Sequence, residues 1–537
     1  MANSLDVALA AQTFDYAGQD IPWLLRQRAA QMPDKAFMIW EPRSGEDKTW
    51  TYKAFDDASS EIAAGLHARG VKKGDKVLIH CENCPEMVLA WYACAKLGAV
   101  SVTTNTRSVG GEIEYFAGHT EAVGAITQPK FAAEVNKSAK NIGWLVVTDN
   151  NSGEEANADE SSHGFDAFDT LYGDAATVPE REAEPMLPIG IMFTSGTTSL
   201  PKAVVHTHAN ALWSGTMGAS SMDVRADDVY LAHLPYFHVN CQSWSFWGCL
   251  GAGATVVLQP KFSASRFWEV IEKHQVTHCS MLPFVFKAIG AQPVPENHSL
   301  RVMPMGIVWK EIEGWLGAKI FASWGMTETT THATRNDFVN EFPQFSIGKP
   351  TPGYTVAIVN PETGEMCGKE EIGELYVHAT RGVQLFLEYY KNPEANEKAF
   401  TADGWFKTGD LGYIGEAGNF FFSDRDKDAL KVGGENVSAR QVEEVCMQVA
   451  GIGEIAVVAK SHDMLDMVPV AFVTRGMGAP EDNAEWEKQI IGHCAANLAD
   501  FKVPRAVYVV DELPKATLEK VAKNKLRELA DEMPAIK

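Results

Sequence analysis

Hydrophobic and polar positions alternate between helical and strand spacing over much of the chain. Residues 59–69 carry apolar side chains at helical spacing, and the short apolar run "DKVLIH" (75–80) that follows is typical of a buried strand. Residues 85–97 predict a second helix, which starts with a proline where a missing N–H costs nothing, and "AVSVTT" (99–104) predicts the next strand. This order of elements predicts a βαβ unit.

The same alternation returns in the middle of the chain. "ATVVLQP" (254–260) predicts a buried strand, "SASRFWEVIEKHQ" (263–275) a helix capped by its first serine, and "VTHCSMLP" (276–283) another strand. Repeated units of this kind predict an α/β fold with layered, largely parallel sheets and helices on their faces. Residues 150–176 are acidic and lose the periodicity, so we expect a surface loop or an internal linker there.

The pattern changes after residue 424. Ser438 and Gln441 form a capping box before a helix that runs to about Val449. The strands "EIAVVA" (454–459), "PVAFVT" (469–474) and "AVYVV" (506–510) surround a second helix at residues 483–498. We therefore expect two domains, a large one at residues 1–424 and a small α+β domain at residues 425–537.

Composition and charge exclude several classes of protein. The 537 residues are 45% apolar and 22% charged, and we find no apolar stretch long enough to cross a bilayer. No basic residue precedes the apolar N-terminal segment, so we expect no secretory signal, no membrane insertion and a cytoplasmic location. A formal net charge of -23 without a long basic run excludes nucleic acid as a partner.

The cysteine pattern favours reduced thiols. The chain has nine cysteines, and Cys81 and Cys84 form a CxxC pair that has no second pair at zinc-like spacing. A predicted helix follows this pair directly. We therefore expect a structural role for both thiols.

A hydroxyl-rich loop follows the apolar run at residues 188–192. "FTSGTTSLPK" (193–202) offers backbone N–H groups, hydroxyls and a lysine, which suit the oxygens of a polyphosphate. The common nucleotide-binding loop requires Gly before the lysine and Ser or Thr after it, but Lys202 stands between Pro201 and Ala203. The loop composition alone leaves open a polar surface turn.

Five ordered motifs resemble those of the adenylate-forming superfamily, which contains acyl-CoA synthetases, luciferases and peptide-synthetase adenylation domains. They are "TSGTTSLPKAVVHTHAN" (194–210), "ASWGMTETTTH" (322–332), "GWFKTGDLG" (404–412), "SDRDKDALKVGGENVS" (423–438) and "LPKATLEKVAKNKLRE" (513–528). Taken singly, Trp324, Glu328, Asp410 and Lys520 have ordinary structural interpretations. Their joint order favours the family, and "SGTTS", "FHVNCQSW" and "GGENVS" are most similar to carnitine/crotonobetaine-type CoA ligases.

The resemblance implies an acid:CoA ligase that forms AMP from ATP with Mg²⁺ and then transfers the acyl group to coenzyme A. The implied phosphate-binding residues are Thr194, Ser195, Gly196, Thr197, Thr198 and Lys202. Thr327 would contact the α-phosphate and Glu328 would bind Mg²⁺, as a hard carboxylate oxygen should. Trp324 would stack on adenine, and Asp410, with Arg425 beside it, would accept from the ribose hydroxyls.

The resemblance also implies a mobile small domain. Lys520 would bridge the carboxylate and the α-phosphate during adenylation. Rotation about the hinge Lys427 would then replace Lys520 with Gly433 and Gly434, which would line the path of the pantetheine arm. Ser199 and Ala203 stand where the family usually has glycine, Trp324 replaces a tyrosine, and Glu519 precedes the lysine.

The acid itself stays open at this stage. By resemblance His238 lines the junction of the acyl and CoA sites, and Trp244 and Trp247 follow it in a segment that has no acidic residue. These aromatic rings suit a trimethylammonium group, and they suit an aryl or aliphatic acid equally well; core packing is the structural alternative. His206 and His208 fit helix-start packing and ligand contact equally.

Two other kinds of protein stay open as alternatives. One is a stand-alone adenylation enzyme that loads a carrier protein, and the other is a nucleotide-binding regulator without catalysis. The retained Glu328, Asp410 and Lys520 argue against the regulator. The expected partners are ATP, CoA and a small carboxylic acid, with a homodimer left open as the assembly.

Overall fold

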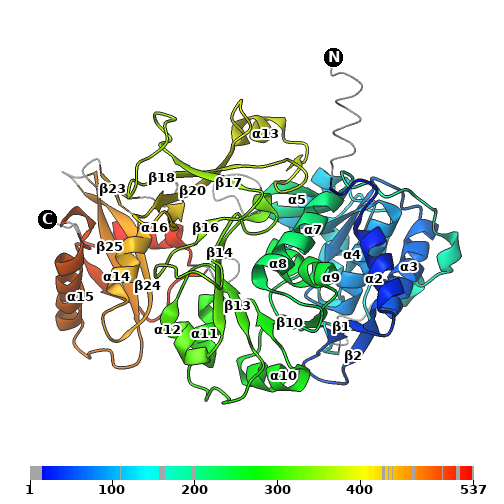
Figure 1. Ribbon diagram of the computed structural model, residues 1–537, viewed down its shortest axis with the longest axis horizontal. Coiled ribbons are helices and arrows are strands. Elements are labelled where there is room, and N and C mark those ends of the chain that lie inside the picture. Colours follow the sequence, from blue (N-terminus) through cyan, green and yellow to red (C-terminus); the bar gives the residue numbers. More distant parts are fainter. Residues whose placement is uncertain are drawn as a thin grey trace. The chain divides into compact units, whose positions relative to one another are not determined.

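The computed structural model describes residues 15–108, 110–155, 164–194, 201–425, 430–432, 435–437, 439–462, 466–498, 500–515 and 521–534. The chain divides into two compact units. Figure 1 labels their helices and strands. Unit 1 comprises Met1–Thr355 and His378–Gly404, and unit 2 comprises Val356–Val377 and Trp405–Lys537. The predicted domain boundary between residues 424 and 425 falls inside unit 2, so it stays a prediction.

The first sheet of unit 1 is the one that carries the hydroxyl-rich loop. Its strands lie in the order β19 (Glu388–Tyr389), β9 (Lys202–Thr207), β8 (Pro188–Thr194), β4 (Val100–Thr103), β3 (Lys76–His80), β5 (Gly124–Thr127), β6 (Leu145–Val147) and β7 (Asp166–Ala167). The pairs from β8 to β7 are parallel, whereas β9 is antiparallel to both β8 and β19. The sheet is therefore largely parallel, as the sequence predicts.

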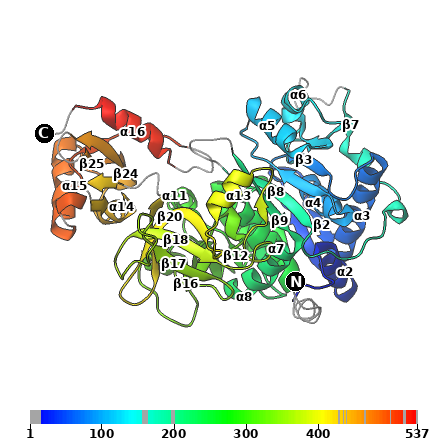
Figure 2. The ribbon, with the colours of Figure 1, turned by 90° about the horizontal axis from the view of Figure 1, so that it is seen from above.

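Helices cover both faces of this sheet (Figure 2). On one face, α3 (Tyr52–Ala68) and α4 (Pro85–Leu97) bury apolar side chains against Val77 and Ile79. On the other, α5 (Gly111–Thr120) and α6 (Pro129–Ser138) pack against Leu78 and Val102. Alternate residues of one strand thus enter two different cores, which is the period-two geometry of a strand covered on both sides.

The predicted linker at residues 150–176 is partly built into the fold. Asp166 and Ala167 form edge strand β7, and the 3₁₀ turn Phe168–Leu171 buries Phe168 and Leu171 in the core. The expectation of a surface loop or linker is wrong for this part. Burial of these two apolar side chains stabilises a segment whose average composition is acidic.

The second sheet of unit 1 has the strand order β16 (Lys349–Pro350), β15 (Thr334–Arg335), β14 (Lys319–Trp324), β13 (Val302–Met305), β12 (His278–Cys279), β10 (Val229–Ala232), β11 (Thr255–Leu258), β1 (Ala36–Trp40) and β2 (Lys48–Thr51). The pairs from β14 to β1 are parallel. The remaining helices of unit 1 in the described residues are α2 (Ile21–Gln31), α7 (His208–Trp213), α8 (Ala219–Met222), α9 (Gly248–Ala252), α10 (Phe267–His274), α11 (Pro283–Ile289), α12 (Lys310–Leu316) and α13 (Pro393–Ala399).

Helix α10 begins later than its sequence suggests. A 3₁₀ turn at Ala264–Arg266 precedes it, and Ser263 makes no capping hydrogen bond through its side chain. The predicted serine cap is therefore wrong, because the chain enters the helix through that tighter turn.

Unit 2 contains two sheets. One has the order β17 (Thr355–Val359), β18 (Gly373–His378), β20 (Phe406–Ile414) and β21 (Phe420–Arg425). The other has the order β23 (Glu435–Val437), β22 (Leu430–Val432), β25 (Asp466–Arg475) and β24 (Ile452–His462), with β26 (Val507–Val509) added on β25. The strands predicted after residue 450 are thus confirmed.

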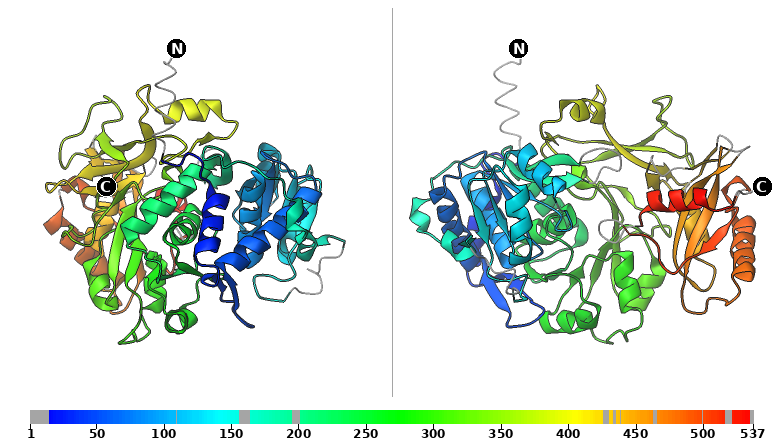
Figure 3. Two further views of the ribbon diagram at one scale, coloured as in Figure 1. Left: turned by 45° about the vertical axis from the view of Figure 1, so that its right-hand side comes forward. Right: turned by 180° about the vertical axis from the view of Figure 1, so that it is seen from behind.

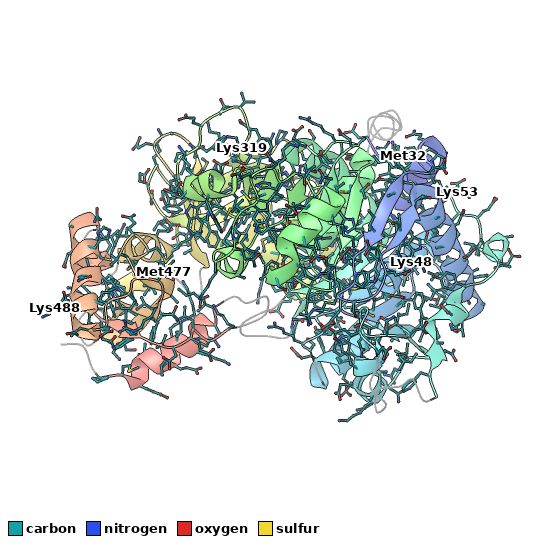
Figure 4. The ribbon with its side chains drawn as sticks, turned by 90° about the horizontal axis from the view of Figure 1, so that it is seen from below. Met32, Lys48, Lys53, Lys319, Met477 and Lys488 are labelled. Carbon is teal, nitrogen blue, oxygen red and sulfur yellow. The ribbon has the colours of Figure 1, made fainter. Side chains whose placement is uncertain are left out.

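Helices lie on both faces of the second of these sheets (Figure 3). Helices α14 (Ala439–Cys446) and α15 (Asn483–Asn497) share one core with Val457 and Val473, and α16 (Lys523–Glu532) shares another with Val458 and Phe472. Ser438, the predicted cap of α14, lies outside the described residues. Met477, in the turn after β25, and Lys488, on α15, project into solvent (Figure 4).

Candidate active site

The hydroxyl-rich loop joins two antiparallel strands of the first sheet. Thr194, the last residue of β8, is the register partner of Lys202, the first residue of β9, and its Oγ1 donates a hydrogen bond of 3.4 Å to the Lys202 carbonyl oxygen. Ser195, Gly196, Thr197 and Thr198 lie outside the described residues. The hairpin register thus brings the two ends of the loop together and places both Thr194 and Lys202 at its base.

The second motif follows the last residue of β14. Trp324 is 7% exposed, and the chain turns sharply after it through Gly325 into the 3₁₀ turn Thr327–Thr329. A Cβ atom on Gly325 would lie 2.4 Å from the Thr331 carbonyl oxygen, so no other residue fits there without backbone movement. Thr330 has φ +63°, a strained backbone for a β-branched residue, as is common at functional sites.

Tyr389 connects the two motifs. Its hydroxyl donates a hydrogen bond of 2.9 Å to Oε1 of Glu328, and the ammonium group of Lys202 lies 4.6 Å from the centre of its ring. Glu328 is 4% exposed and Tyr389 is 3% exposed. Burial, followed by the charge of Glu328, raises the pKa of Tyr389 well above its usual range, so the hydroxyl stays protonated and acts as a donor.

Backbone hydrogen bonds hold the segment that carries Tyr389. The Phe386 N–H donates to the Glu328 carbonyl oxygen at 2.8 Å, and Tyr389 pairs with Val204 of β9. Asn396 of α13 accepts from the Tyr389 N–H at 2.7 Å and donates to its carbonyl oxygen at 2.8 Å. The sequence reasoning missed Tyr389, because a two-residue strand has no periodicity to detect.

His206 supports the same turn from β9. Its Nε2 donates a hydrogen bond of 2.7 Å to the Thr327 carbonyl oxygen, and its ring lies 6.2 Å from that of Trp247. Burial lowers the pKa of His206 to about 4, so the imidazole is neutral near pH 7. His208 instead accepts from the Ile21 N–H through Nδ1 at 3.3 Å, which ties α7 to α2.

The three residues expected at the acid site lie on one helical stretch and the turn before it. His238 is half-buried, and its ring contacts that of Phe237 at 4.6 Å. Residues Cys241–Trp247 form a π-helical turn, a feature that is frequent at functional sites. The indole N–H of Trp244 donates to Thr331 Oγ1 at 3.2 Å, whereas Trp247 is 1% exposed in the main core. Trp244 thus adjoins the Glu328 turn, while Trp247 packs as a core residue.

The ribose motif belongs to unit 2. Asp410 of β20 is 5% exposed and is the register partner of Arg425 in β21, so the two stand beside each other in the ladder. Gly409 precedes it with φ +73°, and the Gly409 N–H donates to Glu374 at 2.8 Å. Lys427, Gly433, Gly434 and Lys520 lie outside the described residues.

A cluster remote from these motifs has metal-ligating residue types. Glu41, Asp47 and His274 place one ligand atom each within 4.8 Å of the others. Glu41, 1% exposed, also accepts from Arg266 and from Lys273, the latter at 2.8 Å. Burial opposes ionisation of Glu41, but hydrogen bonds from Lys273 and His274 outweigh it and lower its pKa to about 2. Two cations already balance the two carboxylates, which indicates a structural ion cluster.

Models of known families match both parts of the chain. The AMP-binding enzyme model matches residues 25–390, and the model of the AMP-binding enzyme C-terminal domain matches residues 441–520. The chain belongs to the AMP-binding enzyme family. Within the described part of this AMP-binding enzyme, no helix has the length and apolar character needed to cross a bilayer.

Similar proteins align with this AMP-binding enzyme over nearly its full length. It is 32% identical to the crotonobetaine/carnitine–CoA ligase of Proteus mirabilis over 524 residues, 94% of this chain and 99% of that protein. O-succinylbenzoate coenzyme A synthetase of Bacillus subtilis, solved with ATP and a magnesium ion, has 28% identity and a TM-score of 0.79, covering 94% of this chain and 98% of that one.

Another solved structure supports the fold alone. The anthranilate CoA ligase solved with anthranoyl-AMP has a TM-score of 0.86 at 23% identity, covering 97% of this chain and 99% of that one. The expected fold class, a large α/β part and a smaller α+β part, is therefore confirmed for this AMP-binding enzyme.

Proposed function

We propose that Thr194, Lys202, Thr327 and Glu328 form the nucleotide end of an adenylating site, and that Lys520 completes it. The reaction class follows from the family: the protein is an AMP-forming acid:CoA ligase that uses ATP, Mg²⁺ and CoA. The observation that carries the proposal for these residues is the contact of Tyr389 with both Lys202 and Glu328. It brings the cation of the phosphate loop and the buried carboxylate of the second motif to one side chain.

Each residue suits one part of the first half-reaction. The substrate carboxylate attacks the α-phosphorus and pyrophosphate leaves, so negative charge develops around the phosphorus and on the leaving group. The β- and γ-phosphates are bound by the Lys202 cation, by the hydroxyls of Thr194, Ser195, Thr197 and Thr198, and by the backbone at Gly196. Thr327 contacts the α-phosphate, and Lys520 bridges it to the carboxylate.

The Glu328 carboxylate fits Mg²⁺. It is a hard oxygen ligand, it is nearly buried, and it is held by a neutral donor, the Tyr389 hydroxyl. When bound, Mg²⁺ neutralises charge on the phosphate oxygens. Glu328 holds it there, while Trp324 stacks on the adenine and Asp410, beside Arg425, accepts from the ribose hydroxyls.

The second half-reaction uses the same acyl-adenylate with CoA. Rotation of the domain at residues 425–537 about Lys427 withdraws Lys520 and brings Gly433 and Gly434 to the pantetheine arm. The thiolate then attacks the acyl carbon, and AMP leaves. Glycine suits this position because it leaves room for the arm close to the backbone.

The acid in this proposal is a small trimethylammonium carboxylate. The relatives named crotonobetaine/carnitine–CoA ligase support this class. Trp244 supports it as well, because its indole is held by Thr331 beside the Glu328 turn and an indole face attracts a quaternary ammonium group. His238 lies six residues earlier on the same stretch and lines the acyl–CoA junction. We further propose a cytoplasmic homodimer.

The test is an ATP–pyrophosphate exchange assay with crotonobetaine, carnitine, benzoate, butyrate and octanoate, with and without CoA. The proposal predicts exchange with the betaines and AMP release once CoA is added. Glu328→Gln should reduce exchange at least tenfold, while the matched change Glu313→Gln on α12 should not. Exchange with the aryl or fatty acids alone would overturn the proposed acid, and equal loss in the two variants would overturn the role of Glu328.

A further inference from the structure

We propose that Tyr389 is a positioning residue that couples the phosphate-binding lysine to the metal-binding carboxylate through its two chemically different ends. The hydroxyl holds Glu328 and the ring holds Lys202. This inference rests on the proposed function, since it assigns Glu328 to Mg²⁺ and Lys202 to the phosphates. It adds a residue that none of the sequence motifs contains.

The hydroxyl end fixes the rotamer of the carboxylate. A carboxylate that accepts a 2.9 Å hydrogen bond at Oε1 is oriented before a metal arrives, so less side-chain entropy is lost on binding. Tyr389 is nearly buried, and so is Glu328, which strengthens the hydrogen bond by excluding water. The donor is neutral, so it orients the carboxylate without cancelling the charge that the metal needs.

The ring end restrains the lysine. The Lys202 ammonium lies 4.6 Å from the ring centre, within the range of an attractive cation–π contact. A lysine has a flexible four-carbon stem, so an aromatic ring beside its head group reduces the positions that it samples. A cation–π contact uses no N–H donor of the ammonium group, so these donors remain available to phosphate oxygens.

The backbone around Tyr389 makes this arrangement rigid. The side-chain amide of Asn396 holds both the N–H and the carbonyl oxygen of Tyr389, and β19 pairs with β9, the strand that begins at Lys202. The Phe386 N–H reaches the Glu328 carbonyl oxygen from the same segment. The backbone segment that carries Tyr389 is therefore bonded both to β9, which begins at Lys202, and to the turn that carries Glu328.

The experiment separates the two ends by substitution. Tyr389→Phe removes the hydroxyl and keeps the ring, Tyr389→Leu removes both, and Tyr390→Phe is the matched control at the next position. Binding of α,β-methylene-ATP is measured by isothermal titration calorimetry over a series of free Mg²⁺ concentrations and in EDTA, with the melting temperature of each variant recorded.

The two ends predict different results. Tyr389→Phe should need about tenfold more free Mg²⁺ for half-maximal nucleotide binding and should bind as the wild type does in EDTA, as expected for one lost charge-assisted hydrogen bond next to a metal ligand. Tyr389→Leu should in addition weaken binding in EDTA about threefold, because the lysine loses its ring. Tyr390→Phe should match the wild type in both conditions.

Two results would overturn the inference. One is a Mg²⁺ dependence of Tyr389→Phe that equals the wild type, and the other is a loss that is the same with Mg²⁺ and with EDTA and follows the drop in melting temperature. Failure of the proposed function looks different, because the wild-type protein itself would then bind no nucleotide.

Discussion

The Nε2 atom of His206 donates a 2.7 Å hydrogen bond to the carbonyl oxygen of Thr327. This bond joins the strand that follows the phosphate loop to the turn that carries Glu328. The two motifs are more than a hundred residues apart in sequence. In the fold, the neutral imidazole of His206 in the first motif holds the backbone of Thr327 in the second.

His206→Ala should therefore lower the adenylation rate about tenfold. The Thr327 carbonyl oxygen would keep the 3.2 Å hydrogen bond from the Thr330 N–H within the turn, but it would lose its bond from β9, so the turn would be free to shift relative to that strand. His298→Ala is the control, because His298 also donates from Nε2 to a backbone oxygen at 2.7 Å, that of Leu316. Single-turnover formation of the acyl-adenylate measures the effect. Equal rates for the two variants would contradict a specific role for His206.

The buried histidines of unit 1 predict an unusual acid sensitivity. Burial lowers the pKa to about 4 for His80, His206, His233 and His278, to about 3 for His332, and well below 6.5 for His208. Since the unfolded chain binds protons below pH 6.5 and the folded one does not, each of these groups makes stability fall as the pH drops from 6.5 toward 4. The slope for one such group is up to about 1.4 kcal/mol per pH unit.

We expect cooperative unfolding between pH 6 and 4, the range in which these histidines are protonated in the unfolded chain but neutral in the folded protein. Glu41 acts at lower pH, because its folded pKa of about 2 lies below the value of about 4.5 in the unfolded chain, so its contribution to stability is lost only as the pH falls below 4.5. Tryptophan fluorescence and circular dichroism in a pH series at constant ionic strength measure the midpoint. A protein with unchanged urea stability from pH 7 to 4.5 would contradict this prediction.

The Glu41 cluster should be a stabilising element. Glu41→Gln leaves Arg266 and Lys273 short of a buried counter-charge, and removal of one partner of such a pair costs about 3 kcal/mol or more. The comparison is Lys53→Ala, since Lys53 lies at the surface on α3 (Figure 4) and forms an exposed pair with Asp57. This pair should contribute little to the free energy of unfolding. Urea unfolding measures both, and a Glu41→Gln protein as stable as Lys53→Ala would contradict the assignment.

The close backbone approach at Gly325 gives another test. A methyl group there meets the Thr331 carbonyl oxygen, so Gly325→Ala must displace the turn that carries Glu328. We expect at least a tenfold loss of nucleotide affinity by calorimetry, since small displacements of positioning groups carry large costs. Gly314→Ala in α12 is the control, because a Cβ atom at that position meets nothing within 4 Å. Unchanged affinity in Gly325→Ala would contradict the geometry.

The sequence predicts helices and strands correctly where residues within the element itself, such as caps and prolines, set its ends. Residues 85–97 were predicted as a helix and are α4, because Pro85 starts it and Gly98 ends it with φ +71°. The predicted helix at residues 483–498 is α15, and Asp482 caps it. The order of motifs in the sequence, in turn, identified the family.

Contacts between distant segments could not be predicted in this way. Tyr389 lies 61 residues from Glu328, and the two meet only in the folded chain, where the Tyr389 hydroxyl donates to Glu328 Oε1. His206 was equally compatible with packing and with ligand contact, and the fold shows that its Nε2 supports Thr327. Trp247 was expected at the acid site together with Trp244, but only the fold distinguishes a core indole from one beside the Glu328 turn.

The most direct test of the account is the identity of the nucleotide product. The purified protein is incubated with ATP, Mg²⁺, CoA and crotonobetaine or carnitine, and the nucleotides are separated by ion-exchange chromatography. The account predicts AMP and pyrophosphate in equal amounts with the acyl-CoA, and loss of AMP formation in Lys520→Ala. Release of ADP and phosphate, or full AMP formation by Lys520→Ala, would contradict it.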